Sequence, residues 1–577
     1  MSKSATRSGL NRRDFLKNTA LLSSGLALLP GMLTSCDDDD EALQYTGDFG
    51  FREGVASFDP SQSSILLWTR YTPATNEPAS ADIRWELAEE AGFGTLKASG
   101  TLTATAATDY TIWTEATGLA SYKTYYYRFR NERTGATSVV GETRTLPAAG
   151  QTTRARLAVV SCANYQAGLF NVYGAVAESQ ADAVVHLGDY IYEYGAGGYG
   201  TNSNTASLNR SHLPAGEILT LDDYRTRYRQ YRSDKQLQLA HQRKAFICVW
   251  DDHELANDAY LTGAENHQPT EGSFESRKQA AIQAWHEYLP ARVTDKTRIY
   301  RRFEFGSLVN LLMLDTRLVG RDKQLSFSDY IGSAGAFNTQ AFGAAWLNPG
   351  RSLLGAEQRS WLTGQLAGNS ARWQVLGSQV LMGKMYIPAE LLTLVAQLAA
   401  GPTPALLAQY STIAGQLAVI KTRILAGDPT VTATERARVE TVLPYNLDAW
   451  DGYPVEREAV LAAAGGKGLI SLAGDTHNAW HSDLMVNSGR KVGAEFATSS
   501  VSSPGFEALL AGSAAAIQGF EQSNQLLIND LQYLDASRRG FLEVEFTSSQ
   551  ATAQWKYVAT LTTESTATTL GRTATEV

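Results

Sequence analysis

The pattern of apolar and polar positions along the chain changes near residue 150. Before that point, short runs rich in β-branched and aromatic residues alternate with polar residues and are separated by turn residues. The clearest runs are residues 64–70, 83–87 and 124–130. This pattern predicts an all-β domain over residues 45–150, which we interpret as a small β-sandwich.

After residue 150, short and continuously apolar runs alternate with helix-like stretches, a pattern typical of buried strands in a layered α/β domain. We predict such a domain over residues 151–560, followed by a C-terminal tail at 561–577. An Ala- and Leu-rich stretch at about 388–441 predicts a helical insert. The predicted buried strands are 157–160, 183–187, 246–250, 308–314, 373–377 and 469–473, and residues 540–546 and 553–557 are predicted to form an antiparallel hairpin.

The chain has 577 residues, enough for two or three domains. With 44% hydrophobic and 19% charged residues, its composition is that of a folded protein. The formal net charge is −9, and no basic patch stands out, so no stable nucleic-acid partner is expected. The three cysteines, Cys36, Cys162 and Cys248, are too few for a disulfide framework. Cys248 lies inside an apolar run and is predicted to be a core residue.

The first 36 residues are predicted to be an export signal. Residues 11–17 contain Arg12-Arg13 and resemble a twin-arginine motif, and the apolar stretch that follows is too short and too rich in Gly and Ser to span a membrane stably. Leu33-Thr-Ser-Cys36 resembles a bacterial lipobox, in which Cys36 is lipidated, and residues 37–44 form an acidic tether. We therefore expect export by the twin-arginine machinery and a lipid-anchored protein in the periplasm or at the cell surface.

Four of the predicted strands end in polar clusters. Because α/β sheets bind ligands beyond the carboxyl ends of their strands, these clusters are expected to converge. Together they form a far more specific signal than any one of them. The clusters are Ser161–Asn164, Gly188–Glu193, Asp251–Glu254 with Asn257, and Gly474–Asn478.

The residue types in these clusters suit a centre with more than one metal ion. Two ions about 3.5–4 Å apart can activate water and neutralise phosphoryl oxygens, and Asp189 is the natural bridge between them. The Tyr192 phenolate and Cys162 thiolate favour a transition metal, ferric iron in particular. The oxygen ligands Asp252 and Asn257 suit calcium.

These motifs resemble the metallophosphoesterase superfamily, and in particular the PhoD-type alkaline phosphatase and phosphodiesterase family. The resemblance rests on Gly188-Asp-x-x-Tyr192, Trp250-Asp-Asp-His-Glu254 and Gly474-Asp-x-His477, with Ser161-Cys162 where most members have Asp-x-His. It implies a layered metallophosphoesterase-like α/β domain behind an N-terminal β-sandwich. It also implies an Fe³⁺ and Ca²⁺ centre that hydrolyses phosphodiesters and phosphomonoesters.

Carried over position by position, the resemblance implies a ligand set. Asp251 and Asp475 lie beside probable ligands, and both direct ligation and a supporting role remain open for them. The implied iron ligands are Cys162, Asp189 and Tyr192, with His477 and the candidate Asp475 at the same centre; the implied calcium ligands are Asp252 and Asn257, with Asp189 shared.

Three further residues are candidates for handling the substrate. His253 either protonates the leaving alkoxide or binds phosphate. Arg225, in a segment that resembles the family's arginine segment, is the candidate for gripping phosphoryl oxygens. Asn164 is a second substrate-binding candidate, and the Gly-rich loop after Tyr194 is an expected pocket wall.

The sequence thus predicts an exported metal-dependent phosphoesterase that acts on a small phosphoester or a phospholipid. A phospholipase D-like esterase on the same metal site is the alternative within enzymes. A non-catalytic surface-binding lipoprotein is the alternative of another class, and the intact ligand set argues against it. A serine-nucleophile alkaline phosphatase ranks low, because no serine comes with its own metal set.

Overall fold

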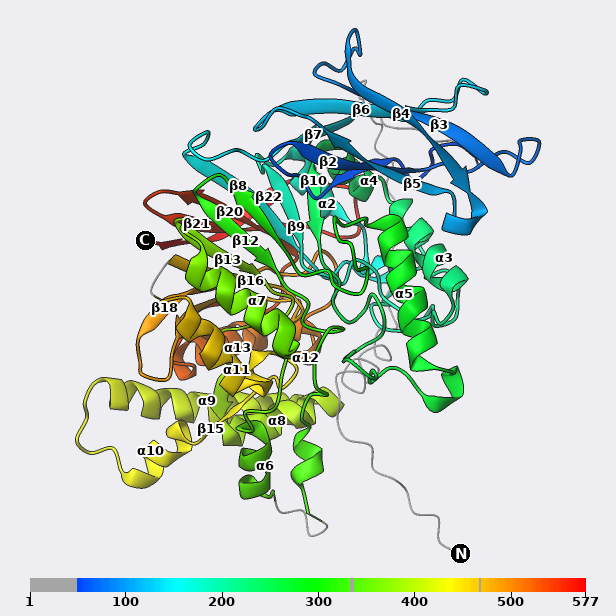
Figure 1. The fold of residues 1–577 in the computed structure, drawn as a ribbon. Helices are drawn as coiled ribbons and strands as arrows, with labels where there is room; N and C mark the ends of the chain where they lie inside the picture. Colours follow the sequence, from blue (N-terminus) through cyan, green and yellow to red (C-terminus); the bar gives the residue numbers. More distant parts are fainter. Residues whose placement is uncertain (1–48, 333–336, 466–467) are drawn as a thin grey trace, which may run out of the picture.

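The computed structural model describes residues 49–332, 337–465 and 468–577 of the chain (Figure 1). The predicted signal, its Arg12-Arg13 pair, the lipidation site Cys36 and the acidic tether lie outside these residues. Two large sheets pack face to face around one hydrophobic core, to which both sheets contribute, and helices cover their outer faces. The predicted α/β class is confirmed.

The first large sheet has nine strands and is mixed. Its centre, β8–β9–β10, is parallel, so these three strands end at one edge. Its order is β22 (Thr568–Glu576), β21 (Ala551–Val558), β20 (Gly540–Thr547), β8 (Arg154–Val160), β9 (Ala183–His186), β10 (Ala245–Cys248), β1 (Val55–Phe58), β2 (Ser64–Arg70) and β5 (Thr111–Thr117).

The second large sheet has seven strands, of which β12, β13, β16 and β18 run parallel. Alternate residues face its two sides: Leu311 packs in the core between the sheets, and Leu312 packs in the outer helical core. Its order is β11 (Arg301–Phe305), β12 (Val309–Met313), β13 (Trp373–Gly377), β16 (Gly468–Ala473), β18 (Lys491–Ala497), β17 (Ala479–Met485) and β19 (Leu531–Asp535).

Helices account for most of the remaining regular structure. The α-helices are α2 (Asn171–Glu178), α3 (Leu221–Arg232), α4 (Lys235–Arg243), α5 (Phe274–Tyr288), α6 (Thr339–Trp346), α7 (Gly355–Gly368), α8 (Ala389–Ala400), α9 (Pro404–Leu425), α10 (Ala433–Glu440), α11 (Pro454–Ala463), α12 (Phe506–Leu509) and α13 (Ala514–Leu527). Among the described residues, we find no helix with both the length and the apolar character needed to cross a membrane.

The predicted N-terminal β-sandwich forms, but one of its two sheets is continuous with a sheet of the α/β domain. Its four-stranded sheet packs over β1, β2 and β5 around a core that includes Ile65, Ile83 and Tyr127. However, β1 pairs in parallel with β10 of the α/β domain, so this half of the sandwich continues the nine-stranded sheet. The four-stranded sheet has the order β4 (Leu96–Thr105), β3 (Ser80–Ala88), β6 (Thr124–Arg130) and β7 (Gly141–Arg144).

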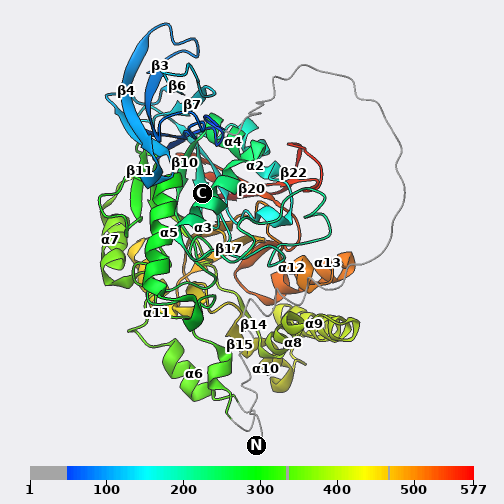
Figure 2. The same ribbon diagram turned by 90° about the vertical axis from the view of Figure 1, so that its right-hand side faces the viewer.

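Two further segments bear on the predicted boundaries. The predicted tail at 561–577 is wrong, because β22 forms there and pairs with β21 at the sheet edge. The segment 388–441 contains α8, α9 and α10, bracketed by the paired strands β14 (Tyr386–Pro388) and β15 (Val442–Pro444). These helices lie at the end of the molecule far from the N-terminal sheet, beside α13 (Figure 2).

Candidate metal centre

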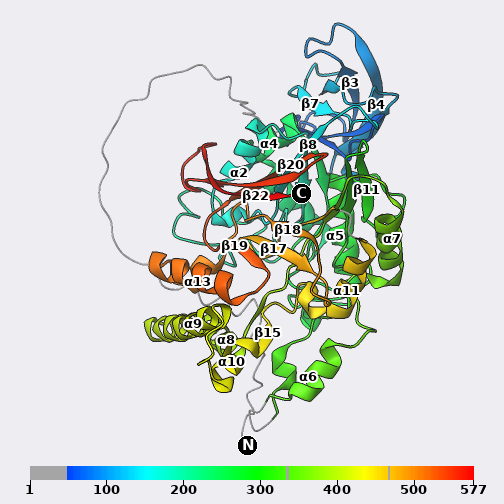
Figure 3. The ribbon, with the colours of Figure 1, turned by 90° about the vertical axis from the view of Figure 1, so that its left-hand side faces the viewer.

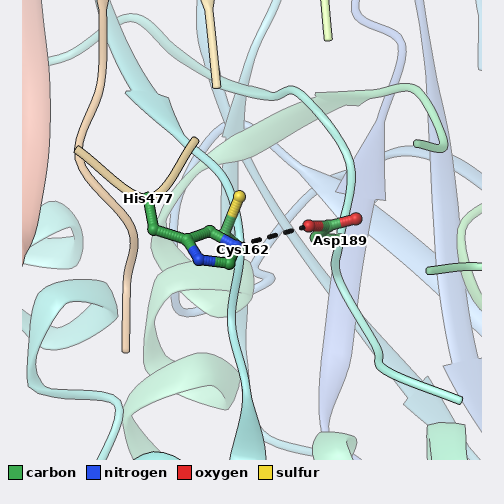
Figure 4. Close-up of side chains that lie close together, drawn as sticks. All are labelled: Cys162, Asp189 and His477. Atoms are coloured by element: carbon green, nitrogen blue, oxygen red, sulfur yellow. Dashed lines mark ion pairs between the residues drawn. The ribbon is translucent and has the colours of Figure 1, made fainter. Parts of the chain in front are cut away.

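The carboxyl ends of parallel strands from both large sheets meet at one place. Cys162 follows β8, Asp189 and Tyr192 follow β9, and His477 follows β16 of the other sheet. Ligand atoms of Cys162, Asp189 and His477 lie within 4.8 Å of one another (Figure 4). The structure therefore brings together three of the five residues that the resemblance implied for the iron centre, whereas Asp475 is grouped with Asp251 and Asp252.

Tyr192 lies at the middle of this group. Its hydroxyl is 3.0 Å from Oδ2 of Asp189 and 3.1 Å from Nε2 of His477. Burial, reinforced by the Asp189 carboxylate, raises the pKa values of the Tyr192 phenol and the Cys162 thiol well above their usual ranges. A bound cation lowers both pKa values, because it binds the deprotonated phenolate and thiolate. The group is therefore suited to bind a strongly polarising ion.

A second group lies next to the first and shares Asp189 with it. Ligand atoms of Asp189, Asp252 and His253 also lie within 4.8 Å of one another. Asn257 is fully buried, and its Oδ1 has no hydrogen-bond partner within the described chain. A buried carbonyl oxygen without a partner is costly, and a hard cation would satisfy it. Asp189 is thus the residue that the two groups have in common.

The backbone at these positions is unusual. Cys162, Asp189, Asp475 and His477 have φ values of 61°, 54°, 62° and 65°, in the left-handed region that non-glycine residues rarely adopt. Such conformations persist where surrounding structure enforces them, and they gather at functional sites. Gly188 allows the loop after β9 to pass close to the loop after β10, since a Cβ at residue 188 would lie 2.4 Å from the backbone nitrogen of Asp251.

Glu254 ties two of the ligand loops together. Its Oε2 accepts hydrogen bonds from the backbone N–H groups of Asp189, at 2.9 Å, and Asp251, at 2.8 Å. Its Oε1 accepts a third from the N–H of Tyr190, at 2.6 Å. One buried carboxylate therefore fixes the loop after β9 against the loop after β10.

A buried arginine that the sequence analysis missed pairs with the acidic residues behind the centre. The guanidinium of Arg317 bonds to Asp251, lies 2.9 Å from Asp448 and lies 3.2 Å from Asp475. Ligand atoms of Asp251, Asp252 and Asp475 lie within 4.8 Å of one another, and the single positive charge of Arg317 offsets part of their combined negative charge. A sequence signal was present, because Asp315-Thr-Arg317 is a polar cluster that begins two residues after Met313, the last residue of β12.

The structure does not bring Arg225 to the centre. Its guanidinium pairs with Glu287 and donates to the backbone oxygen of Ala107, in the N-terminal region. Arg227, two residues along the same helix, instead donates to the backbone oxygen of Tyr192. A helix turns about 100° per residue, so the two arginines point to different sides.

Asn164 is near the centre, but its side chain is engaged by the protein. Its Oδ1 accepts from the N–H of Gln166, and its Nδ2 donates to the backbone oxygen of Tyr199. Tyr199, from the loop after Tyr194, reaches Nδ1 of His477 with its hydroxyl at 2.8 Å. Asn164 therefore holds the loop that forms a wall beside His477.

The fold is shared with a solved phosphatase structure. Purple acid phosphatase PPD1 from yellow lupin (Lupinus luteus) seeds has a TM-score of 0.50 and 11% identity, covering 90% of this chain and 73% of that chain. The two proteins therefore share a fold.

The chain belongs to the PhoD-like phosphatase family. The family's model matches residues 157–555, and the model of its N-terminal domain matches residues 38–147. Alkaline phosphatase D of Bacillus subtilis (strain 168) is 33% identical over 514 residues, which cover 86% of this chain and 76% of the relative. A solved structure titled "Structure of PhoD" has 28% identity and a TM-score of 0.70, covering 92% of this chain and 91% of that chain. The protein is accordingly a hydrolase of phosphoric esters, and the predicted family is confirmed.

Proposed function

We propose that the centre holds Fe³⁺ and Ca²⁺ and that the enzyme hydrolyses both phosphodiesters and phosphomonoesters. The observation that carries this proposal is the placement of Tyr192 and Cys162 in one group with Asp189 and His477. A thiolate and a phenolate together favour ferric iron over magnesium or calcium. Asp252 and Asn257, which offer only oxygen, fit calcium.

The unpartnered Oδ1 of Asn257 supports the fit of a hard cation at the second group. When bound, such ions would activate a water molecule and neutralise the phosphoryl oxygens. The protein's own contribution is to hold the ligands before any ion arrives. Glu254 and Arg317 do so from behind, through the contacts described above.

His253 is the proposed proton donor to the leaving oxygen. Its Nδ1 is held by Glu193, which leaves Nε2 as the nitrogen that can face a substrate. Burial disfavours the imidazolium, but nearby carboxylates, led by Asp252 and Glu193, raise the pKa of His253 well above its usual value. Glu193, which is not among the proposed metal ligands, thus favours the protonated imidazole that a proton donor requires.

The test is metal analysis of protein purified without chelator, beside rates on a nitrophenyl diester, a nitrophenyl monoester and phosphatidylcholine. We expect iron and calcium, activity on both nitrophenyl esters, and loss of metal and activity together in Asp189→Ala. A calcium chelator should abolish hydrolysis while leaving colour from the tyrosine and cysteine ligands. Fully active, colourless enzyme containing only zinc would refute the iron assignment. Hydrolysis of phosphatidylcholine alone would favour the phospholipase alternative.

We also propose that the protein is exported by the twin-arginine route and anchored through lipidated Cys36. The support is the motif sequence alone. Anchoring would rest on buried acyl chains, so Cys36→Ser should release the mature protein from membranes. Lys-Lys in place of Arg12-Arg13 should separately block export. Equal partition of wild type and Cys36→Ser in a detergent fractionation would contradict the anchor.

A further inference from the structure

A second group of possible metal ligands lies where the two large sheets come together at the C-terminus. His481 and Asp483 are two residues apart on β17, so they share a face of the seven-stranded sheet. Glu576 is at the end of β22, the edge strand of the nine-stranded sheet (Figure 3). Ligand atoms of the three side chains lie within 4.8 Å of one another. None of the three belongs to the catalytic centre.

His481 lacks the partners that a buried imidazole needs. The residue is 7% exposed, and neither Nδ1 nor Nε2 has a hydrogen-bond partner in the described part of the chain. Its ring packs against Phe496 and Trp555, which fix its orientation. Burial lowers the pKa of His481 to about 4, so the ring is neutral near pH 7 and has a lone pair to offer. Buried polar atoms without partners are uncommon and need an explanation.

The two carboxylates already attract a positive charge. The ammonium of Lys491 lies 2.7 Å from Asp483 and 2.6 Å from Glu576. Two carboxylates and one ammonium leave a net charge of −1. The Lys491 side chain is 39% exposed, so it can turn into solvent without being buried elsewhere. Lys491 satisfies the acids but leaves the imidazole unpaired.

We propose that His481, Asp483 and Glu576 form a site for a divalent transition-metal ion of the Zn²⁺ type, for which the Lys491 ammonium is a competitor. One imidazole nitrogen with two carboxylates is a ligand set of zinc rather than of calcium, which takes oxygen ligands only. The ion would replace the ammonium, pair the buried imidazole and link β17 to β22. It would thus fasten the C-terminal strand of one sheet to the other sheet.

Zn²⁺ binding to the full-length enzyme, with its catalytic ions in place, tests the proposal. Equilibrium dialysis followed by elemental analysis should show one more zinc equivalent in wild type than in His481→Phe, which keeps the ring packing. Zinc binding at the catalytic centre is common to both proteins and cancels in this difference. Lys491→Gln should bind the extra zinc about tenfold more tightly, because two competing ion pairs are gone. Lys556→Gln, which breaks a lysine–glutamate pair between β21 and β20, is the matched control and should not change zinc affinity.

A second readout and a second variant keep the test decisive. Zinc should slow hydrogen exchange of the backbone amides of β22 in wild type and not in His481→Phe. If His481→Phe fails to fold, Glu576→Gln replaces it, since Glu576 is near the chain end and its loss leaves the core intact. Equal zinc equivalents in wild type and both ligand variants would overturn the proposal. So would unchanged zinc affinity in Lys491→Gln.

Discussion

The Nδ1 atom of His253 lies 2.7 Å from Oε2 of Glu193, and the two side chains are 1% and 0% exposed. The other oxygen of Glu193 accepts from the backbone N–H of Asn257 at 2.8 Å and from the amide of Asn266 at 2.8 Å. One buried carboxylate therefore orients both the proposed proton donor and a proposed calcium ligand. Such supporting groups fix the tautomer and direction of the side chains they hold.

Replacing Glu193 by glutamine tests this relationship. We expect kcat of Glu193→Gln to fall about 10–100-fold, because the imidazole loses its orienting acceptor. The alkaline limb of the pH–rate profile should move to lower pH, since a neutral amide no longer stabilises the imidazolium. Steady-state rates across pH measure both effects. Glu217→Gln, which removes a carboxylate that pairs with Arg277 instead, is the control. An unshifted profile in Glu193→Gln would show that Glu193 does not act through His253.

Glu254 is predicted to govern metal retention. Glutamine offers one acceptor oxygen where the carboxylate serves three backbone N–H groups, so at least one of these groups loses its partner. We expect Glu254→Gln to bind the catalytic metals about 10–100-fold more weakly. Chelator competition followed by elemental analysis measures this. Glu254→Asp, which is shorter by one methylene, should not restore binding. Wild-type metal retention in both variants would contradict the positioning role.

Arg225 and Arg227 make a matched pair within α3. We expect Arg225→Ala to keep kcat/KM within about twofold and to lose about 1–2 kcal/mol of unfolding free energy, since its contacts are a paired glutamate and a surface backbone oxygen. Arg227→Ala should lower activity more, because it removes a donor to the backbone of Tyr192. Nitrophenyl ester kinetics and urea denaturation separate the two effects. A loss of 100-fold or more in Arg225→Ala with normal stability would instead assign Arg225 to the substrate.

The strand ends were predictable from sequence because each buried strand is a continuous apolar run that stops at a polar cluster. That signal located Cys162, Asp189, Asp252 and His477, and the parallel pairing explains why they converge. The role of Arg225 was not predictable in this way, because tertiary packing decides which side of a helix faces the site. Arg317 was missed although it follows β12, because an arginine after a strand is not a metal-ligand type.

Residues 561–577 show a different limit. The segment is polar and rich in threonine, so it carries no apolar signal of its own, and most of β22 is exposed. Its strand exists because β21 offers an unpaired edge, and edge pairing depends on a neighbour rather than on local composition. The pairing of β1 with β10 likewise depends on a strand that is distant in the sequence. Local composition therefore does not predict that the N-terminal sandwich joins the main sheet.

Arg317 is predicted to be essential for folding stability. Removing one partner from a buried charge network leaves the others uncompensated, so Arg317→Met should cost about 3–5 kcal/mol of unfolding free energy. Arg317→Lys keeps the charge but not the planar fork, and should recover only part of this loss. Thermal and urea denaturation of the metal-loaded proteins measure the series. Equal stability of wild type and Arg317→Met would mean that the acidic residues are neutralised in another way.

Asp451 supplies a pH-dependent contribution to stability outside the catalytic centre. Its Oδ2 accepts from the backbone N–H of Met385 at 2.8 Å, and its Oδ1 has no hydrogen-bond partner in the structure as described. Burial raises the pKa of this carboxyl from 3.8 to about 7. The folded state thus keeps a proton that the unfolded state releases near pH 4, so between these pKa values the unfolding free energy falls as pH rises.

Asp451→Asn removes this titration and keeps the acceptor for Met385. Wild type should lose on the order of 3 kcal/mol more stability than Asp451→Asn between about pH 4 and about pH 8, where the folded carboxyl has ionised. Urea denaturation at these two pH values measures the difference. Effects of pH on the catalytic centre are common to both proteins and cancel. Asp428→Asn is the control: it removes a partly exposed carboxyl whose pKa is about 2, so its pH dependence should match that of wild type over the same range. Parallel pH dependence in wild type and Asp451→Asn would show that Asp451 is already ionised in the folded protein near pH 5, and that electrostatic attraction to Arg457 and Lys384 offsets its burial.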